Sequence, residues 1–333
     1  MSFKDIKGQE RSLAQLNGYL QNDRSASSYL FIGPEGVGKH LAAMTLAKAV
    51  NCLEENSDSC DRCFSCSKIE KKAHPDVHTI DAAALKSAGA ENDTVVHDSD
   101  AIKIEEIRRL QKEINLKPYE ARKKVFIIND AHQMTAESSN ALLKTLEEPP
   151  ANSLIILVTA KPNLLFKTVI SRCKMVKFYP LERNKLREIM KGEYACDEEF
   201  AHFLAYFCEG RIGRAIKLKD TDILGTKNRV IDEIVLHHRA DPEHGLGLAK
   251  QDLRNYLNIM ATWFRDIYLL KTGSSFSELI NADRKDELTR SARAYSWSAL
   301  DEILKFIADS LLYLEQNINP KLLLSNLKYT FEN

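Results

Sequence analysis

A strand that runs into a glycine-rich loop and then into a helix is the feature that most constrains this chain. Residues 28 to 33 read SYLFIG, residues 33 to 40 read GPEGVGKH, and apolar residues at helical spacing continue to Val50. The pattern G-x-x-x-x-G-K between a strand and a helix predicts a phosphate-binding loop, because glycines let successive backbone amides point at phosphate oxygens. The sequence therefore predicts an α/β nucleotide-binding domain.

Four further apolar runs indicate the remaining strands of a sheet. Their hydrophobicity is continuous rather than alternating, which is typical of parallel strands buried on both faces. Helical patterns lie between them, one with its apolar residues on a single face and one stopped by two prolines. The predicted strands are residues 77 to 80, 123 to 130, 153 to 160 and 175 to 178, and the helices are residues 104 to 114 and the segment SSNALLKTLEEPP.

The strand pattern disappears after Pro180, and helical periodicity dominates the rest of the chain. Residues 182 to 222 have the pattern of a small helical bundle, interrupted by EGRIGRA. Longer helices follow, broken at residues 239 to 247 and 272 to 277. We expect three domains, at residues 1–178, 179–222 and 223–333.

Composition argues against two classes of protein. The chain has 47 basic and 47 acidic residues, so it is not broadly charged for nucleic acid or anionic membrane. Hydrophobic residues make up 44% and charged residues 28%, as in ordinary globular proteins. The amino terminus has no apolar signal region and no apolar run approaches membrane-spanning length. We therefore expect a cytoplasmic protein that is not bound to a membrane.

The loop itself departs from the phosphate-loop pattern at one position. Gly33, Gly36 and Gly38 allow the tight backbone, and Lys39 would reach the terminal phosphates. A serine or threonine that binds Mg²⁺ is expected next, but the chain has His40. Imidazole is a poor ligand for this hard ion, so we interpret His40 as a first-turn helix residue in a site that has no need of metal.

A second departure affects the same metal centre. A hydrolytic site ends the strand at residues 123 to 130 with Asp-Glu, one carboxylate for the metal and one to activate water. This chain has Asn129, which carries no charge, and Asp130, which is one methylene shorter than glutamate. Two independent changes at one metal centre predict that the chain does not hydrolyse ATP.

Four of the seven cysteines lie within residues 52 to 66 and form a metal-binding pattern. Cys52, Cys60, Cys63 and Cys66 have the spacing C-x7-C-x2-C-x2-C, and four thiolates close a structural Zn²⁺ site. An iron–sulfur cluster is the alternative. His74 is surplus to these ligands and is interpreted as a loop residue. The remaining cysteines are interpreted as structural rather than reactive, namely Cys173, Cys196 and Cys208.

Several strings together resemble the clamp-loader subunits of bacterial DNA polymerase III, which belong to the AAA+ superfamily. They are FKDIKGQE, GPEGVGKH, the four cysteines, HPDV, SSNALLKTLEEPP, the SRC at residues 171 to 173, WFRDIYLLKTG and NINPKLLL. The resemblance implies a P-loop domain, a helical lid at residues 179–222 and an all-α collar at residues 223–333. Motor subunits keep both metal-site motifs intact, so the departures at His40 and Asn129 resemble the delta-prime class.

The resemblance also implies roles for individual residues. Arg172 matches an arginine finger that enters the ATP site of a neighbouring motor subunit, and a guanidinium can stabilise charge on a transferring phosphoryl group. Thr159 and Arg214 match two sensor positions. The segment that lines the adenine pocket corresponds to Ile6, Gly8 and Gln9. Whether ATP, ADP or no nucleotide occupies the loop stays open at this point.

Three functions are weighed. The first is a silent subunit of a heteropentameric ring with gamma/tau motors and delta, acting on the sliding clamp and primer–template DNA within the DNA polymerase III holoenzyme. The second is a gamma/tau-like motor that hydrolyses ATP. The third is a nucleic-acid-binding module that uses Lys68, Lys71 and Lys72. Apolar helix faces after Lys227 predict assembly through the collar or, alternatively, an internal helical core; they include Leu253, Leu257 and Met260.

Overall fold

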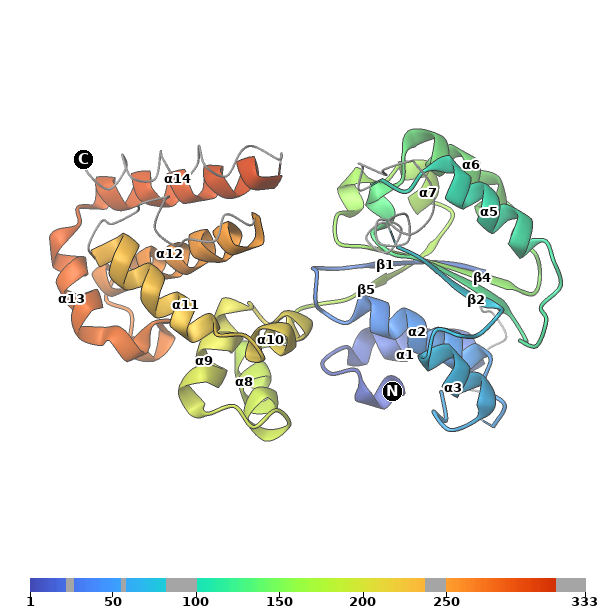
Figure 1. Ribbon diagram of the computed structural model, residues 1–333, viewed down its shortest axis with the longest axis horizontal. Coiled ribbons are helices and arrows are strands. Elements are labelled where there is room, and N and C mark those ends of the chain that lie inside the picture. Colours follow the sequence, from blue (N-terminus) through green and yellow to red (C-terminus); the bar gives the residue numbers. More distant parts are fainter. Residues whose placement is uncertain (22–26, 55–57, 82–100, 237–249, 316–333) are drawn as a thin grey trace. The chain divides into compact units, whose positions relative to one another are not determined.

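The computed structural model describes residues 1–21, 27–54, 58–81, 101–236 and 250–315 (Figure 1). The described chain divides into two compact units, Met1–Leu181 with Arg211–Gly213 and Glu182–Gly210 with Arg214–Asn333. The division after Leu181 is close to the boundary expected near residue 178. The further separation of a lid from a collar at residue 222 stays a prediction.

The first unit is built on a five-stranded parallel sheet. Its strand order is β2-β3-β4-β1-β5, and every neighbouring pair is parallel. The strands are β1 (Ser28–Ile32), β2 (Val77–Ile80), β3 (Lys124–Ile128), β4 (Ser153–Thr159) and β5 (Lys174–Lys177). All five predicted strands are confirmed within one or two residues at each end.

Helices cover both faces of this sheet, as the continuous strand hydrophobicity predicts. In Figure 1 the helices α1, α2 and α3 lie on one face and α5, α6 and α7 on the other. Their bounds are α1 (Glu10–Gln21), α2 (Lys39–Val50), α3 (Phe64–Glu70), α5 (Ile104–Ile114), α6 (Ala136–Glu147) and α7 (Lys167–Ile170). Short 3₁₀ helices occur at η1 (Phe3–Asp5), η2 (Ala131–Gln133) and η3 (Pro162–Leu164).

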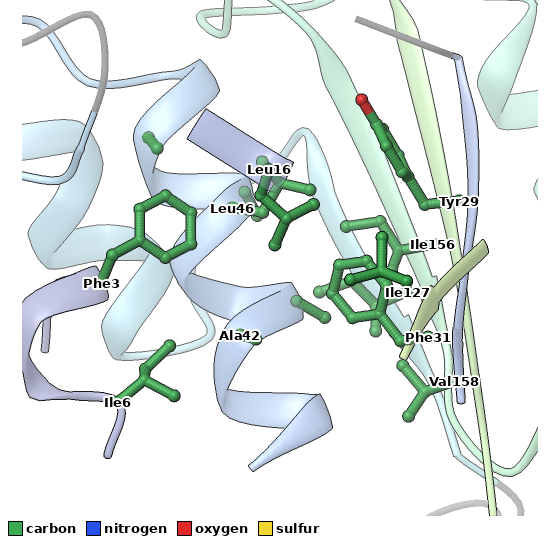
Figure 2. Packing of buried hydrophobic residues seen from close by; sticks show 14 of the residues in the cluster. Phe3, Ile6, Leu16, Tyr29, Phe31, Ala42, Leu46, Ile127, Ile156 and Val158 are labelled. Carbon is green, nitrogen blue, oxygen red and sulfur yellow. The ribbon is translucent and has the colours of Figure 1, made fainter. Parts of the chain in front are cut away.

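Alternate residues of β1, β3 and β4 supply two separate cores. Tyr29 and Phe31 of β1 pack with Leu46 of α2 on one face, as Figure 2 shows. Leu30 of β1 packs instead with Leu142 of α6 and other residues of the opposite face. Because successive side chains of a strand point to opposite faces, one apolar strand stabilises both layers.

The second unit is entirely helical among its described residues. Its elements are α8 (Arg183–Gly192), α9 (Glu198–Phe207), α10 (Ile212–Lys219), α11 (Ile223–Arg229), the π-helix η4 (Val230–Leu236), α12 (Lys250–Lys271), η5 (Phe276–Glu278), η6 (Ala282–Arg284), α13 (Lys285–Ala294) and α14 (Trp297–Glu315). The predicted break at 272 to 277 is confirmed. The predicted break at 239 to 247 and the NINPKLLL segment lie outside the described residues.

The apolar faces named for assembly are inside this unit. Leu253 is 2% exposed, and Leu257 and Met260 are fully buried. These side chains therefore build the internal helical core, the alternative reading of that pattern. Among the described residues, the model contains no helix that is both long enough and apolar enough to cross a membrane.

Candidate functional site

The predicted nucleotide-site residues of the loop, of the Asn129-Asp130 pair and of β4 meet at the carboxyl edge of the sheet. Ile32, the last residue of β1, is in register with Thr159, the last residue of β4, and Ile128 of β3 is in register with Leu157. The loop after β1, the Asn129-Asp130 pair after β3 and Thr159 therefore share one edge, because these strands are parallel. This edge is where α/β sheets bind ligands.

The loop at residues 33 to 40 has the backbone that its glycines predict. Gly33, Gly36 and Gly38 have φ values of 151°, 80° and 98°. A Cβ on Gly33 would lie 2.3 Å from the carbonyl oxygen of Phe178, so a side chain is excluded there. Gly38 is the N-cap residue of α2 and has left-handed backbone angles, and no side chain caps the first turn. The helix thus keeps the amide groups that could bind an anion.

Lys39 is folded back onto this loop. Its Nζ donates to the carbonyl oxygens of Gly33 and Pro34 at 2.7 and 2.6 Å, and the residue is only 7% exposed. Burial lowers the pKa of Lys39 to about 8, although the carboxylates of Asp130 and Glu35 oppose this shift. The ammonium group therefore lies within the loop, bonded to the protein's own carbonyls.

The two substituted metal positions contact each other. His40 Nδ1 lies 3.0 Å from Asn129 Oδ1 and donates to it, because the amide oxygen can only accept. Asn129 is 8% exposed, and its amide nitrogen lies 3.5 Å from Asp81 Oδ2. In a motor, a hydroxyl and a carboxylate at these two positions would hold Mg²⁺. Here an imidazole and an amide satisfy each other, so the donor set does not fit a magnesium ion.

Asp130 and Thr159 are engaged locally. Asp130 adopts the left-handed conformation, with φ 45°, at the start of η2. Thr159 is fully buried, and its hydroxyl lies 3.1 Å from His132 Nδ1 and accepts from the amide of Lys161 at 3.0 Å. Burial lowers the pKa of His132, while Asp130 opposes that shift. His132 was not among the predicted site residues, although its place two residues after Asp130 was an available signal.

The amino-terminal segment fixes the loop through Gln9. The side-chain amide nitrogen of Gln9 donates to the carbonyls of Val37 and Tyr179 at 3.3 and 2.6 Å, and its oxygen accepts from the Tyr179 amide at 3.1 Å. Ile6 is 7% exposed and is the nearest neighbour of a Cβ built on Gly38. Gly8 has φ 68°. Through these hydrogen bonds to backbone groups, the Gln9 side chain links Val37 and Tyr179, which are far apart in the sequence.

Arg172 and Arg214 belong to different units. Arg172 follows α7 in the first unit, and its guanidinium contacts Glu147 and the carbonyl of Thr168. Arg214 belongs to the second unit, and its guanidinium lies 4.8 Å from the centre of the Phe207 ring. Each of the two arginines therefore has partners within its own unit.

The four cysteines predicted as metal ligands come together. The Sγ atoms of Cys52, Cys60, Cys63 and Cys66 all lie within 4.8 Å of one another. Tetrahedral zinc has Zn–S distances of about 2.3 Å, which place the sulfurs of such a site about 3.8 Å apart. Backbone amides of Cys63 and Cys66 donate to the sulfurs of Cys60 and Cys63 at 3.3 and 3.4 Å. The donor set fits one tetrahedral ion, and His74 is not part of it.

The lysines considered for nucleic acid differ in their surroundings. Lys68 Nζ donates to both carboxylate oxygens of Glu120 at 2.7 and 2.9 Å and lies 4.2 Å from the centre of the Phe64 ring. Lys71 and Lys72 are exposed. An ion pair already occupies one of the three lysines, which weakens the case for a basic surface here.

Family models match most of the chain. Residues 8–182 match the model described as "DNA polymerase III, delta subunit", and residues 242–332 match "DNA polymerase III, delta subunit, C terminal". DNA polymerase III subunit delta' of Bacillus subtilis is 28% identical over 98% of this chain and 97% of its own length.

Further matches include two tau subunits and a solved structure. Subunit tau of Bacillus subtilis is 28% identical over 86% of this chain, and tau of Escherichia coli is 33% identical over 70%. The matches span only 54% and 35% of those relatives. A gamma subunit-related protein from Thermotoga maritima is 18% identical with a TM-score of 0.44, covering 96% of this chain and 99% of its own.

Proposed function

Because this chain belongs to the DNA polymerase III delta subunit family, we propose that it works in a clamp loader without hydrolysing ATP itself. The chain is a clamp-loader subunit of the delta' type, since the delta' relative is matched over nearly its whole length. The tau relatives are matched over about half of their length or less. What needs argument is how a subunit with this loop contributes to the loader.

The hydrogen bond between His40 and Asn129 carries the proposal. Magnesium prefers oxygen ligands in near-octahedral geometry, and hydrolysis needs a carboxylate near the attacking water. In this chain the two metal positions hold an imidazole and an amide joined at 3.0 Å. Recruiting a metal would require breaking that bond and would still leave no carboxylate at residue 129. We therefore assign no ATPase activity to the isolated chain.

Arg172 supplies the chemistry that the chain itself lacks. It lies in the SRC string, and its side chain is 31% exposed, so part of the guanidinium remains accessible. In the proposal it acts as an arginine finger at the ATP site of a neighbouring gamma/tau motor. The ring would also contain delta and would act on the sliding clamp and primed DNA in the cytoplasm.

Two ligands belong to this proposal. The four thiolates hold one structural Zn²⁺, which closes residues 52–66 into a compact module. The loop binds ATP or ADP weakly and without metal, through its backbone amides and Lys39. Such binding requires Lys39 to exchange the carbonyls of Gly33 and Pro34 for phosphate oxygens.

Measurement of ATP hydrolysis by the purified chain, alone and reconstituted with motor and delta subunits, tests the proposal. We expect no magnesium-dependent hydrolysis by the chain alone, and DNA-stimulated hydrolysis that depends on its presence in the loader. Restoring the metal ligands with His40→Thr, Asn129→Asp and Asp130→Glu should make nucleotide binding by the chain magnesium-dependent. Rapid hydrolysis by the unaltered chain that Lys39→Ala abolishes would instead identify a motor.

A further inference from the structure

The guanidinium of Arg172 is held on two sides by its own subunit. Its Nε donates to Glu147 Oε1 at 2.8 Å, and its Nη2 contacts the same oxygen. Its Nη1 donates to the carbonyl oxygen of Thr168 at 3.0 Å. A single carboxylate oxygen and one backbone carbonyl therefore fix the plane of the guanidinium.

The elements that carry these groups share one core. Glu147 ends α6, directly after Leu146, which is 4% exposed and packs in the core on that face of the sheet. Val169 of α7 is fully buried in the same core, and Cys173 packs against it. Figure 1 shows α6 and α7 on the same face of the sheet. The packing of α6 and of α7 in this one core therefore determines where Glu147 and Arg172 meet.

The position of Glu147 costs its own helix some stability. A carboxylate in the last turn of a helix lies near the partial negative charge of the unpaired carbonyls, which is unfavourable for the helix. Pro149 and Pro150 follow Glu148, so the helix cannot continue and carry Glu147 into its interior. Glu147 accepts hydrogen bonds from Arg172. This contact offsets the unfavourable interaction between its carboxylate and the end of the helix.

The remaining donors of Arg172 are those that a phosphate would need. A guanidinium has five N–H groups in a fixed plane. Contacts among the described residues engage three of them, one each on Nε, Nη1 and Nη2, and leave one on Nη1 and one on Nη2. N–H groups of a guanidinium that are not engaged within the subunit can donate to phosphoryl oxygens.

We propose that Glu147 is a positioning residue that orients the Arg172 finger before the neighbouring subunit arrives. This inference depends on the finger role assigned to Arg172 above. An exposed arginine loses side-chain entropy when it is fixed in one conformation. Glu147 and the Thr168 carbonyl restrict Arg172 within the free subunit, so the loader need not order it during assembly.

The test uses the reconstituted loader with primed DNA and compares Glu147→Ala, Arg172→Ala and the double variant. Glu147→Ala should lower the DNA-stimulated kcat about tenfold and leave KM for ATP unchanged, because the motor itself binds the nucleotide. Arg172→Ala should lower kcat about a thousandfold. In the Arg172→Ala background, Glu147→Ala should have no further effect. Glu148→Ala removes the adjacent exposed carboxylate and is the matched control, which should retain full activity.

Two conservative variants separate positioning from a general effect on structure. Glu147→Gln keeps an acceptor oxygen at the same reach and should recover most of the activity, whereas Glu147→Asp is one methylene shorter and should not. A Glu147→Ala loader with normal or raised kcat, or a further loss in the Arg172→Ala background, would overturn the positioning role. Unchanged kcat in Arg172→Ala would overturn the proposed finger itself. Thermal unfolding of each purified variant shows that the subunit is folded.

Discussion

At the scale of the residue, Asp76 is the buried carboxylate that organises the turn before β3. Its oxygens accept from the backbone amides of residues 119 to 121 at 2.8 to 3.0 Å, and it is 1% exposed. Burial raises the pKa of Asp76, but the three amides and Lys124 outweigh this and leave it below its ordinary value. The aspartate of the HPDV string therefore acts as a structural anion, and His74 supports it by accepting from the Asp76 amide at 3.1 Å.

Asp76→Ala should lower the free energy of unfolding by about 3 kcal/mol, because several buried amides lose their acceptor. Since the pKa of Asp76 is lower in the folded state, its contribution is complete above the unfolded pKa of about 3.9 and is lost as the pH falls through the folded value. Urea unfolding from about pH 7 down to about pH 3 measures this loss.

The matched control for Asp76 is Glu188→Gln, at an exposed position beyond the first turn of α8. It should unfold like the unaltered chain at every pH. Asp76→Asn retains an acceptor but no charge, so its stability should depend less on pH. An acid transition identical in Asp76→Asn and the unaltered chain would show that Asp76 does not contribute to it.

At the scale of the element, the cysteine module is attached to the helix that begins at the phosphate loop. Lys48 of α2 is almost fully buried, and its Nζ donates to Asp61 and Glu70 at 2.5 and 2.7 Å. Burial lowers the pKa of Lys48, but the two carboxylates more than offset this and raise it overall. A metal ion bound by the four cysteines would therefore stabilise a region that is packed on α2.

We expect about one zinc ion per purified chain, because four thiolates complete a tetrahedral site. Cys63→Ser should reduce the zinc content to less than about half and lower the melting temperature, as should prolonged treatment with a strong chelator. Elemental analysis and thermal unfolding measure the two effects.

Cys196→Ser is the control, since Cys196 is half-buried and lies in the second unit, outside the metal-ligand cluster. It should retain its zinc and its melting temperature. Iron with visible absorbance in place of zinc would support the iron–sulfur alternative, and carefully purified chain without any metal would exclude a metal module.

At the scale of the whole molecule, the second unit joins the proposed lid and collar. His202 of α9 donates through Nε2 to the carbonyl of Leu279 at 2.7 Å. Lys227 of α11 is 2% exposed, pairs with Asp283 at 2.5 Å and lies 5.3 Å from the centre of the Phe203 ring. Residues on both sides of position 222 thus depend on each other, and we infer that they unfold together.

Lys227→Met should destabilise this unit by about 2 kcal/mol, because Asp283 loses its partner and a buried ammonium is removed. Hydrogen exchange should then quicken in α9 as well as in α11, if lid and collar unfold together. Lys305→Met, at an exposed position of α14, should change neither helix. Faster exchange confined to α11 would show that the lid folds independently of the collar.

Local spacing in the sequence was enough for much of this protein. Strand hydrophobicity predicts all five strands of the sheet and the burial of both its faces. The glycines predict the loop conformation, and the cysteine spacing predicts the cluster. Each of these features depends on residues that are close in the chain, so a pattern within a short window contains the necessary information.

The partners of the site residues could be learned only from the folded chain. His40 meets Asn129 across 89 residues, Gln9 meets Tyr179 across 170, and Arg172 meets Glu147 across 25. Residue types alone were enough to predict that the chain has no magnesium site, because an imidazole and an amide stand where a hydroxyl and a carboxylate are required. The sequence could not determine what stands in place of such a site, since a hydrogen bond depends on distances that exist only after the sheet brings separate strand ends to one edge.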